Sequence, residues 1–369
     1  MLKRICFVTT GDIKRIATSK RALGMANNLS GLGWKVYILM EDTCENRHRV
    51  GLECDGRTEV FYFPASSAIV ERKEKERLLA RIKPDYVYIC AFVFRNMVYP
   101  THRCVRLIEH SELRSAIKDV KWWRRIYESF VEYYSLIYGD GLLNASVFLQ
   151  KLYKSRCVRV FRSGLPMLYF PYAYSEKLYG KCVSPVGLAL EKNENDVFVT
   201  YLGSLSKAYC TIDIVKAVQL ISDIRIKVLL LGDGDDSNRI KKYVADNALQ
   251  EVVWMPGYIN EEHISAYFSM TDVFVLPMND TVQDKARCPS KLYMYLPYGK
   301  PIVTAKVGEP FEVLKDDGVY YQAGSVDSLA LAIKEAIAKK ELGASPELHE
   351  WKERVHVFDS WIKNSFDKK

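Results

Sequence analysis

Two basic side chains, four residues apart, open the segment of this chain with the clearest chemistry. Arg287 and Lys291 precede an apolar, aromatic run that closes with Gly299-Lys300-Pro301. At this spacing the two cations would share one face near the start of a helix. A helix N-terminus also offers unpaired N–H groups and a positive dipole end, so the arrangement suits an anionic ligand. The alternative is a surface helix that carries two solvated cations.

Turns that contain glycine follow two apolar runs in the second half of the chain. A glycine directly after a strand lets the backbone approach a phosphate closely. Each turn alone is also typical of an ordinary connection between elements. The residues are Gly203 and Ser204 after the first run, and Gly232 and Gly234 after the second.

A histidine flanked by two carboxylates follows an apolar, strand-like run in the first half. His110 lies between Glu109 and Glu112. Small changes in surroundings can hold such a histidine charged or neutral, which suits a site beside a phosphorylated ligand. A structural histidine with a hydrogen-bonded partner is the equally weighted alternative.

Basic charge is concentrated in the N-terminal half. Residues 1–180 hold 30 Lys and Arg against 18 Asp and Glu, a net charge of +12, and the remainder has a net charge of −4. This asymmetry indicates an acidic partner, such as anionic lipid headgroups, a diphosphate-linked acceptor or nucleic acid. Ordinary solubilising charge is the alternative. The chain has no recognisable nucleic-acid-binding motif, so we expect no nucleic acid partner.

The segment 121–134 combines cations with aromatic residues. It begins Lys121-Trp122-Trp123-Arg124-Arg125 and continues with four more aromatic side chains. Trp and Tyr beside cations are typical of a peripheral helix at a membrane interface. The alternative is a buried aromatic face whose cations reach out to solvent. We expect peripheral membrane contact through this segment.

The chain alternates strands and helices, which predicts βαβ units and parallel sheets. Its length of 369 residues and 49% hydrophobic content suggest two domains with a core each. The turn-rich stretch 172–195 is the expected boundary. Two doubly wound halves that face one another would place a site in the cleft at the carboxyl ends of the strands. Strands are expected at 5–9, 36–40, 59–63, 86–90, 197–202, 226–231, 252–255, 273–277 and 302–305, and helices at 19–29, 71–82, 211–220, 239–247 and 264–270.

The cysteines and the hydropathy of the chain argue against a disulfide-bonded secreted protein and against a membrane-spanning one. The nine cysteines are an odd number, and none are two or three residues apart. A metal site and a disulfide framework are therefore both weakly indicated, and a reduced cytoplasmic setting fits best. The chain has no apolar stretch long enough for a signal peptide and no run of about 18 apolar residues. We expect a cytoplasmic protein, soluble or at most peripheral on the inner face of the membrane.

The segment from Ala286 to Val303 resembles the nucleotide-sugar site of the retaining GT-B glycosyltransferases of family 4, also called glycosyl transferases group 1. The family pattern reads roughly Ala-Arg-aromatic-Pro-x-Lys-Leu-x-Glu-Tyr-Leu-x-x-Gly-Lys-Pro-Ile-Val. Two positions depart from it: Met294 stands where the family has an acid, and Ala286 where it has a second glutamate. The matching residues are Ala286-Arg287, Pro289, Lys291-Leu292, Tyr295-Leu296 and Gly299-Lys300-Pro301-Ile302-Val303.

The resemblance implies roles for residues elsewhere in the chain. The loop with Tyr258 and Ile259 would meet the nucleobase, and Glu309 would face the ribose or sugar of the donor. Glu309 and Asp284 are the candidates to replace the missing acid. The Lys-Gly pair that follows the first glycine loop in the family has no clear counterpart here. On the acceptor side the candidates are Gly11, Glu109 and Glu112.

The implied fold is GT-B, with two Rossmann-like domains at 1–180 and 190–345 and a helix in 346–369 that crosses back onto the first. The implied reaction moves a sugar, with retention, from a nucleotide-diphosphate donor to a hydroxyl of a glycan or lipid-linked acceptor, as in cell-surface polysaccharide or glycoconjugate synthesis. Arg287, Lys291 and His110 are the catalytic candidates. Neither a metal nor another cofactor is expected. Because of Ala286 and Met294, a non-catalytic GT-B scaffold or partner of an active transferase is the alternative.

Overall fold

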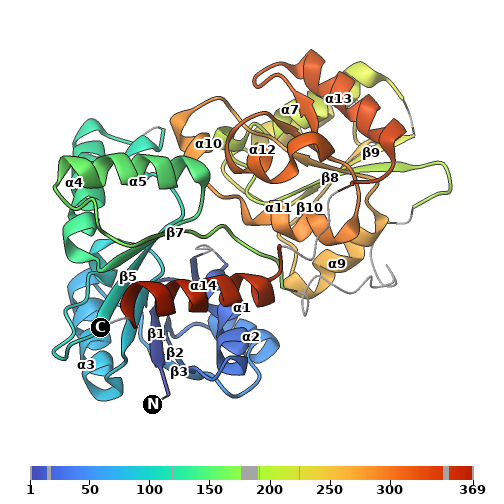
Figure 1. Ribbon diagram of the computed structural model, residues 1–369. Coiled ribbons are helices and arrows are strands. Elements are labelled where there is room, and N and C mark those ends of the chain that lie inside the picture. The colour runs from blue at the N-terminus through green and yellow to red at the C-terminus, as the bar shows by residue number, and fades with distance from the viewer. Residues whose placement is uncertain are drawn as a thin grey trace. The chain divides into compact units, whose positions relative to one another are not determined.

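The computed structural model describes residues 2–14, 18–118, 120–175, 190, 192–223, 225–343 and 349–367. The chain forms two compact units. Unit 1 comprises Met1–Ala173, Ala286–Cys288 and His349–Lys369, and unit 2 comprises Tyr174–Lys285 and Pro289–Leu348 (Figure 1). Most of the predicted boundary, residues 176–189, lies outside the described residues, as do residues 345 and 346.

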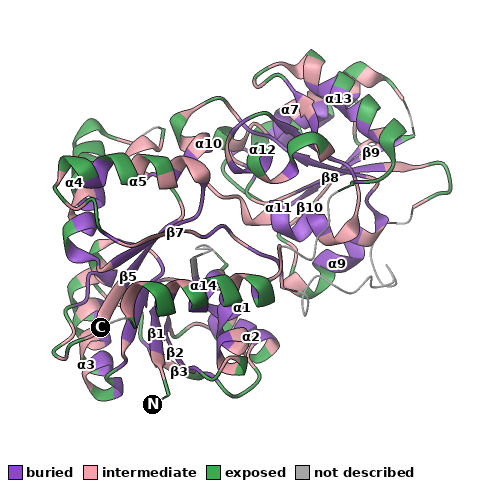
Figure 2. Ribbon diagram, viewed as in Figure 1, coloured by how far each residue is buried: buried purple, intermediate pink, exposed green. Residues whose placement is uncertain are grey.

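Unit 1 is built on a seven-stranded parallel sheet in the order β3-β2-β1-β4-β5-β6-β7. Alternate side chains of β1 enter different cores, with Ile5 and Phe7 on one face of the sheet and Cys6 and Val8 on the other. Because the sheet is covered on both faces, its inner strands are mostly buried, while the edge strands β3 and β7 are largely half-buried (Figure 2). The strands are β1 (Arg4–Val8), β2 (Lys35–Glu41), β3 (Glu59–Phe63), β4 (Tyr86–Ile89), β5 (Val105–His110), β6 (Gly141–Asn144) and β7 (Met167–Tyr169).

The helices of unit 1 cover both faces of this sheet. One core includes residues of α1 and α14, and the other includes residues of α3, α4 and α5. Trp351 of α14 lies directly against Gly24 of α1, where an added Cβ would collide with the indole ring. The helices are α1 (Thr18–Gly31), α2 (Cys44–Glu53), α3 (Ala68–Ile82), α4 (Trp122–Tyr138), α5 (Val147–Arg159) and α14 (Trp351–Phe366), with 3₁₀ turns η1 (Phe94–Asn96) and η2 (Arg114–Ala116).

Unit 2 has a six-stranded parallel sheet in the order β10-β9-β8-β11-β12-β13. Its strands are β8 (Val197–Leu202), β9 (Ile226–Leu231), β10 (Val253–Gly257), β11 (Val273–Leu276), β12 (Ile302–Ala305) and β13 (Val319–Tyr321). Its helices include α7 (Ile212–Ile221), α8 (Ser237–Asp246), α9 (Glu261–Met270), α10 (Val282–Ala286), α11 (Ser290–Tyr295), α12 (Gly308–Leu314) and α13 (Val326–Lys339). Short 3₁₀ turns are η3 (Lys207–Tyr209), η4 (Leu296–Tyr298) and η5 (Lys315–Asp317).

The two parallel sheets confirm the predicted α/β class with two doubly wound, Rossmann-like parts. All nine predicted strands and all five predicted helices exist, with ends that differ by a few residues. The sequence reading missed several elements, among them α2, α5 and α13. It also missed β6, β7 and β13, which have only four, three and three residues and are too short to show an alternating pattern.

One local prediction is wrong: Arg287 and Lys291 do not share a helical face. Helix α10 ends at Ala286, and α11 begins at Ser290 after Pro289, whose backbone is extended. Proline disfavours helical geometry in the residue before it and lacks an N–H group. Arg287 therefore lies in a linker, and only Lys291 lies in α11, a helix of six residues.

None of the helices in the described ranges is both long enough and apolar enough to cross a membrane.

Candidate functional site

The predicted donor-binding residues of unit 2 gather at one edge of its sheet. Gly203 and Gly232 follow β8 and β9, and Glu309 lies shortly after β12. Because all these strands are parallel, their carboxyl ends meet at the same edge. From β8 the chain proceeds outward to β9 and β10 and then returns to place β11 on the other side of β8, so the strand order reverses between β8 and β11. In open α/β sheets this is where ligands bind.

The glycine turns at this edge are packed closely together. Gly203 and Gly232 have φ values of +135° and +142°, which side chains on L-residues rarely allow. A Cβ on Gly232 would collide with the Gly203 carbonyl, and one on Gly203 would collide with the Lys291 ammonium. The Gly232 N–H donates to the Gly257 carbonyl at 2.8 Å. These contacts bring three loops and the Lys291 side chain to one place.

Lys291 is held by two tyrosine residues. Its Nζ donates to the Tyr201 hydroxyl at 2.8 Å and lies 4.0 Å from the centre of that ring. The Tyr209 ring centre is 5.3 Å away. The Tyr201 hydroxyl in turn donates to the Ser204 carbonyl at 2.9 Å, which ties the cation to the loop after β8. Lys291 is half-buried.

The loop expected to meet a nucleobase lies beside the Gly232 turn, through the bond to Gly257. Tyr258 is 42% exposed, and Ile259 is half-buried. An exposed ring next to a glycine turn provides a flat surface against which a base can stack.

The two carboxylates proposed to replace the missing acid are both buried. Glu309 accepts a hydrogen bond from the Tyr293 hydroxyl at 3.1 Å, and Asp284 accepts one from the Asn279 N–H at 2.7 Å. A Cβ on Gly308 would lie 2.8 Å from the Asp284 carbonyl, so the two acids lie in neighbouring loops. Met294 itself is only 3% exposed.

Arg287 falls in a different unit from Lys291. The short segment Ala286–Cys288 belongs to unit 1, where Ser146 Oγ donates to the Ala286 carbonyl at 2.8 Å. The Tyr172 N–H donates to Cys288 Sγ at 3.3 Å in the same unit. The two cations that the sequence pairs are therefore positioned by separate sets of contacts.

Unit 1 has a pocket of about 530 Å³ at the carboxyl edge of its own sheet, here called the unit-1 pocket. The loops after β1, β4 and β5 line it, together with α4. The strand order reverses between β1 and β4, so this pocket also lies at a switch point. The three residues predicted for the acceptor side, Gly11, Glu109 and Glu112, line it together with the catalytic candidate His110.

His110 is a buried and neutral member of this group. Burial, with a smaller effect of Arg156, lowers the pKa of His110 to about 3. Ser135 donates its own proton to the Glu132 carbonyl at 2.6 Å, so His110 Nε2 donates to Ser135 Oγ at 3.0 Å. Nδ1 then accepts from the Tyr153 hydroxyl at 3.1 Å. With both nitrogens bonded, this geometry favours the structural interpretation.

The Glu109 carboxylate is likewise engaged in contacts with other side chains of the protein. Its carboxylate lies 2.8 Å from Arg21 Nε, and both side chains are 2% exposed. Burial raises the pKa of Glu109, and Arg21 opposes that rise. Arg21 also donates to the Phe170 and Pro171 carbonyls at 2.9 and 3.1 Å. Glu112, by contrast, is exposed and lies 3.3 Å from Arg114.

A second buried charge cluster next to the unit-1 pocket escaped the sequence analysis. Glu71 accepts from Thr10 Oγ1, Lys75 Nζ and Arg95 Nη1, each at 2.6 Å. Burial lowers the pKa of Lys75 to about 8, although Glu71 opposes this. Thr10 and Arg95 line the pocket, so this cluster holds two of its walls together. The spacing of Glu71 and Lys75 was the available signal, but it is also common on solvated helices.

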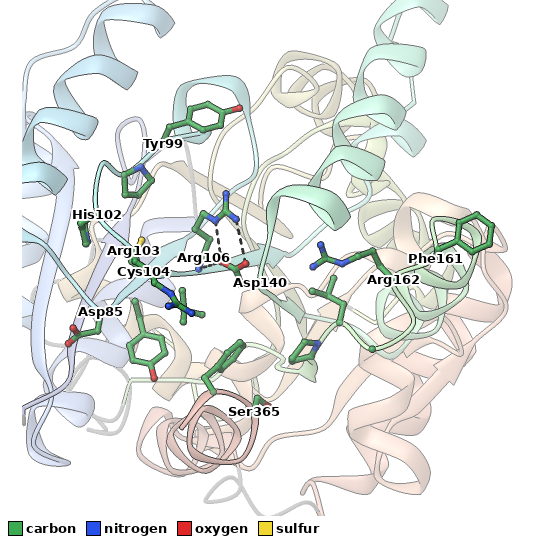
Figure 3. A pocket seen from close by; sticks show the side chains of 17 residues that line it. Asp85, Tyr99, His102, Arg103, Cys104, Arg106, Asp140, Phe161, Arg162 and Ser365 are labelled. Atoms are coloured by element: carbon green, nitrogen blue, oxygen red, sulfur yellow. Dashed lines mark hydrogen bonds and ion pairs between the residues drawn. The ribbon is translucent and has the colours of Figure 1, made fainter. Parts of the chain in front are cut away.

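A larger hollow of about 1230 Å³ lies at the amino edge of the unit-1 sheet (Figure 3). Arg106 lies 3.1 Å from Asp140 within it, and Arg162 donates to the Gly139 carbonyl at 3.1 Å. None of the residues singled out in the sequence lines this hollow. Among the described residues, no group of three or more His, Cys, Asp or Glu side chains is placed to hold a metal ion.

Comparisons with known proteins match this architecture. Residues 189–355 match the model of the family glycosyl transferases group 1. A glycosyltransferase structure from Rickettsia africae ESF-5 superposes with a TM-score of 0.72 at 13% identity, over 100% of both chains. This is the GT-B fold. No curated protein sequence matches the chain.

Two further structures share the GT-B fold with nearly complete coverage. Anabaena HepE in complex with UDP and glucose has a TM-score of 0.69 at 13% identity, over 97% of this chain and 95% of that one. Sucrose-phosphate synthase from Thermosynechococcus elongatus has a TM-score of 0.68 at 17% identity, over 99% and 97%. At these identities the likeness is one of fold.

Proposed function

We propose that this protein is a glycosyltransferase that moves a sugar from a nucleotide-diphosphate donor to a hydroxyl of a glycan or lipid-linked acceptor. The observation that carries the proposal is the position of Lys291. Its ammonium lies against the Gly203 turn at the switch point of unit 2, within the part of the chain that matches the family model. A cation beside a strand-to-glycine turn suits a diphosphate.

The reaction breaks the bond between the anomeric carbon and the diphosphate oxygen and forms one to the acceptor oxygen. The hydroxyl proton leaves with the nucleoside diphosphate or to water. Negative charge grows on the diphosphate as it departs, and Arg287 and Lys291 are the side chains that we assign to neutralise it. Each lost contact of this kind typically lowers turnover by about 10²–10³.

Retention of the anomeric configuration and independence of a metal are proposed from the resemblance to the retaining family. The Gly203 and Gly232 turns let the backbone approach the phosphates closely, because neither glycine has a side chain; their own N–H groups donate to the Leu231 and Gly257 carbonyls. Tyr258 and Ile259 receive the base. We assign the ribose and sugar to the two buried, neighbouring loops that carry Asp284 and Glu309.

The acceptor is assigned to the unit-1 pocket, with the product a cell-surface polysaccharide or another glycoconjugate. The charged side chains of the pocket with the most exposure are Glu112 at 48%, Arg95 at 40% and Arg114 at 29%. Because Glu109 and His110 are hydrogen-bonded internally, we assign them to shaping the pocket.

A thermal-shift screen against UDP, GDP, ADP, CDP and their common sugar conjugates tests the donor site. UDP comes first because the HepE structure contains UDP. A ligand at about 100 times its Kd adds about 2.7 kcal/mol of stability, which raises the melting temperature clearly. Transfer assays with the responding nucleotide sugar then test catalysis. A folded sample that responds to none of the panel contradicts the proposal.

A non-catalytic GT-B scaffold is the second candidate, because Ala286 and Met294 replace both acids of the family motif and are buried. Methionine offers packing but no hydrogen bond to a ribose hydroxyl. Nucleotide binding without transfer or donor hydrolysis is the result that favours this candidate.

A further inference from the structure

Helix α4 has many exposed residues (Figure 2), and in its first half the exposed side chains include large apolar and aromatic ones. Trp122 is 74% exposed, Ile126 62% and Phe130 66%, with Trp123 at 54%. Large apolar side chains on a soluble protein are normally scattered singly, and a contiguous group marks an interaction site. We call this group, with the three cations described next, the α4 face.

Basic and acidic side chains of α4 are directed differently, the basic ones toward solvent and the acidic ones toward the protein. Lys121, Arg124 and Arg125 are exposed. Both carboxylates of the helix turn inward: Glu128 lies 2.9 Å from Arg114, and Glu132 lies 2.9 Å from Arg156. Arg124 also approaches Glu128 at 3.6 Å while remaining half exposed. The outward side of α4 therefore combines apolar rings with positive charge.

The α4 face borders the unit-1 pocket. Tyr127 and Val131 line the pocket from α4, while Ala68 and Phe94 line it elsewhere. The neighbours of Ala68 in α3, Ile69 and Val70, are 54% and 55% exposed. Apolar side chains thus continue beside the pocket beyond α4.

This combination selects one kind of partner. Indole rings prefer the boundary between lipid headgroups and acyl chains, and nearby cations reach the phosphates. A helix with a basic, aromatic outer side and an anchored inner side lies in the plane of that boundary. Positive charge without exposed carboxylates on the helix favours anionic over zwitterionic lipid.

We propose that the α4 face docks on an anionic phospholipid bilayer and brings the unit-1 pocket to its surface. Docking itself is independent of the catalytic assignment. Its consequence, that the acceptor is a lipid-linked hydroxyl reached at the bilayer, rests on the proposed function and names the substrate class for the acceptor site.

Vesicle co-sedimentation of the full chain tests docking. Vesicles of phosphatidylcholine alone are compared with vesicles containing 30 mol% phosphatidylglycerol. We expect binding at least tenfold stronger to the anionic vesicles, weakened by added salt. Replacing Trp122, Ile126 and Phe130 with Ser should lower that binding at least tenfold. The matched control replaces three exposed apolar residues of unit 2, Leu220, Val282 and Leu331, with Ser and should bind as the parent does.

Brominated lipids show whether the rings enter the bilayer. We expect quenching of tryptophan fluorescence in the parent protein and much less quenching in Trp122→Phe/Trp123→Phe. Absence of vesicle binding by the parent, or equal binding by the Ser variant, overturns the proposal. A self-association that the Ser variant abolishes, without vesicle binding, identifies a second copy as the occupant and also overturns it.

The nucleotide thermal shift, measured without vesicles, separates this proposal from the proposed function. The Ser variant should keep the shift of the parent. If neither the parent nor the Ser variant responds to nucleotide but the parent still binds anionic vesicles, the catalytic assignment fails and docking stands. If nucleotide binds normally and vesicles do not, docking alone fails.

Discussion

The Lys291 ammonium lies 2.8 Å from the Tyr201 hydroxyl and 4.0 Å from the centre of the Tyr201 ring. The contact fixes the cation against the turn after β8, where an added Cβ on Gly203 would touch it. A flexible lysine therefore has a defined position before any ligand arrives. Preorganised charge of this kind stabilises a leaving diphosphate more than mobile charge does.

We expect Lys291→Ala to lower kcat by about 10²–10³ while the fold survives. Tyr201→Phe keeps the ring and removes the hydroxyl, so we expect a smaller loss, about tenfold. Steady-state kinetics with the nucleotide sugar found in the screen distinguishes them. If Tyr201→Phe were as damaging as Lys291→Ala at an unchanged melting temperature, the hydroxyl would itself contact the donor.

Arg287→Ala should reduce transfer by a similar factor of about 10²–10³, because we assign the Arg287 guanidinium, like Lys291, to neutralise the charge on the departing diphosphate. A neutral result in both Arg287→Ala and Lys291→Ala would remove the donor-site assignment. Lys242→Ala, an exposed cation on α8, is the control and should retain full activity.

Met294→Glu tests the departure from the family motif. Met294 is 3% exposed, so a carboxylate there should destabilise the protein without ligand. Ribose hydroxyls could then donate hydrogen bonds to the new carboxylate, so we expect nucleotide to raise the melting temperature more than it does in the parent. A smaller shift would mean that the pocket is built around the thioether.

Gly232→Ala should destabilise unit 2 by about 1–3 kcal/mol, since its φ of +142° is strained for alanine. The new Cβ would also collide with the Gly203 carbonyl, so nucleotide binding should weaken. Denaturant unfolding measures the first effect and the thermal shift the second. Gly51→Ala is the control: nothing lies within 4 Å of its Cβ position, and alanine suits helix α2 better.

His110 predicts a pH dependence of stability. Its pKa is lowered to about 3 in the folded state, below the ordinary value of 6.5. Between these values the unfolded chain binds the extra proton, so stability should fall as the pH drops through 6.5 toward 3. The slope approaches about 1.4 kcal/mol per pH unit for this group.

Urea unfolding from pH 7 to pH 5 in the parent and in His110→Asn measures this contribution. The variant should have a shallower slope. His349, with a pKa lowered to about 4 by burial and then Arg354, adds a slope of the same sign in both proteins. Equal slopes in the parent and in His110→Asn would contradict the neutral imidazole.

Alternating strands and helices, and with them two parallel sheets, could be predicted from the residues alone. Local physics is sufficient here: apolar runs such as 226–231 form buried strands, and the glycines that follow them mark the carboxyl edge where ligands bind. The sequence also identified four residues that the fold brings to one pocket, because Gly11, Glu109, His110 and Glu112 lie at or just after the carboxyl ends of strands in one sheet.

Tertiary structure decided what those side chains do. Glu109 became half of a buried ion pair because the fold brings Arg21, 88 positions earlier, to 2.8 Å. Burial made His110 neutral, and partners on α4 and α5 took both of its nitrogens. Helix α4 could have buried its rings or exposed them; pairing Glu128 and Glu132 inward turned Trp122 and Phe130 to solvent. Burial and long-range contacts are properties of the packed chain, and no local pattern of residues contains them.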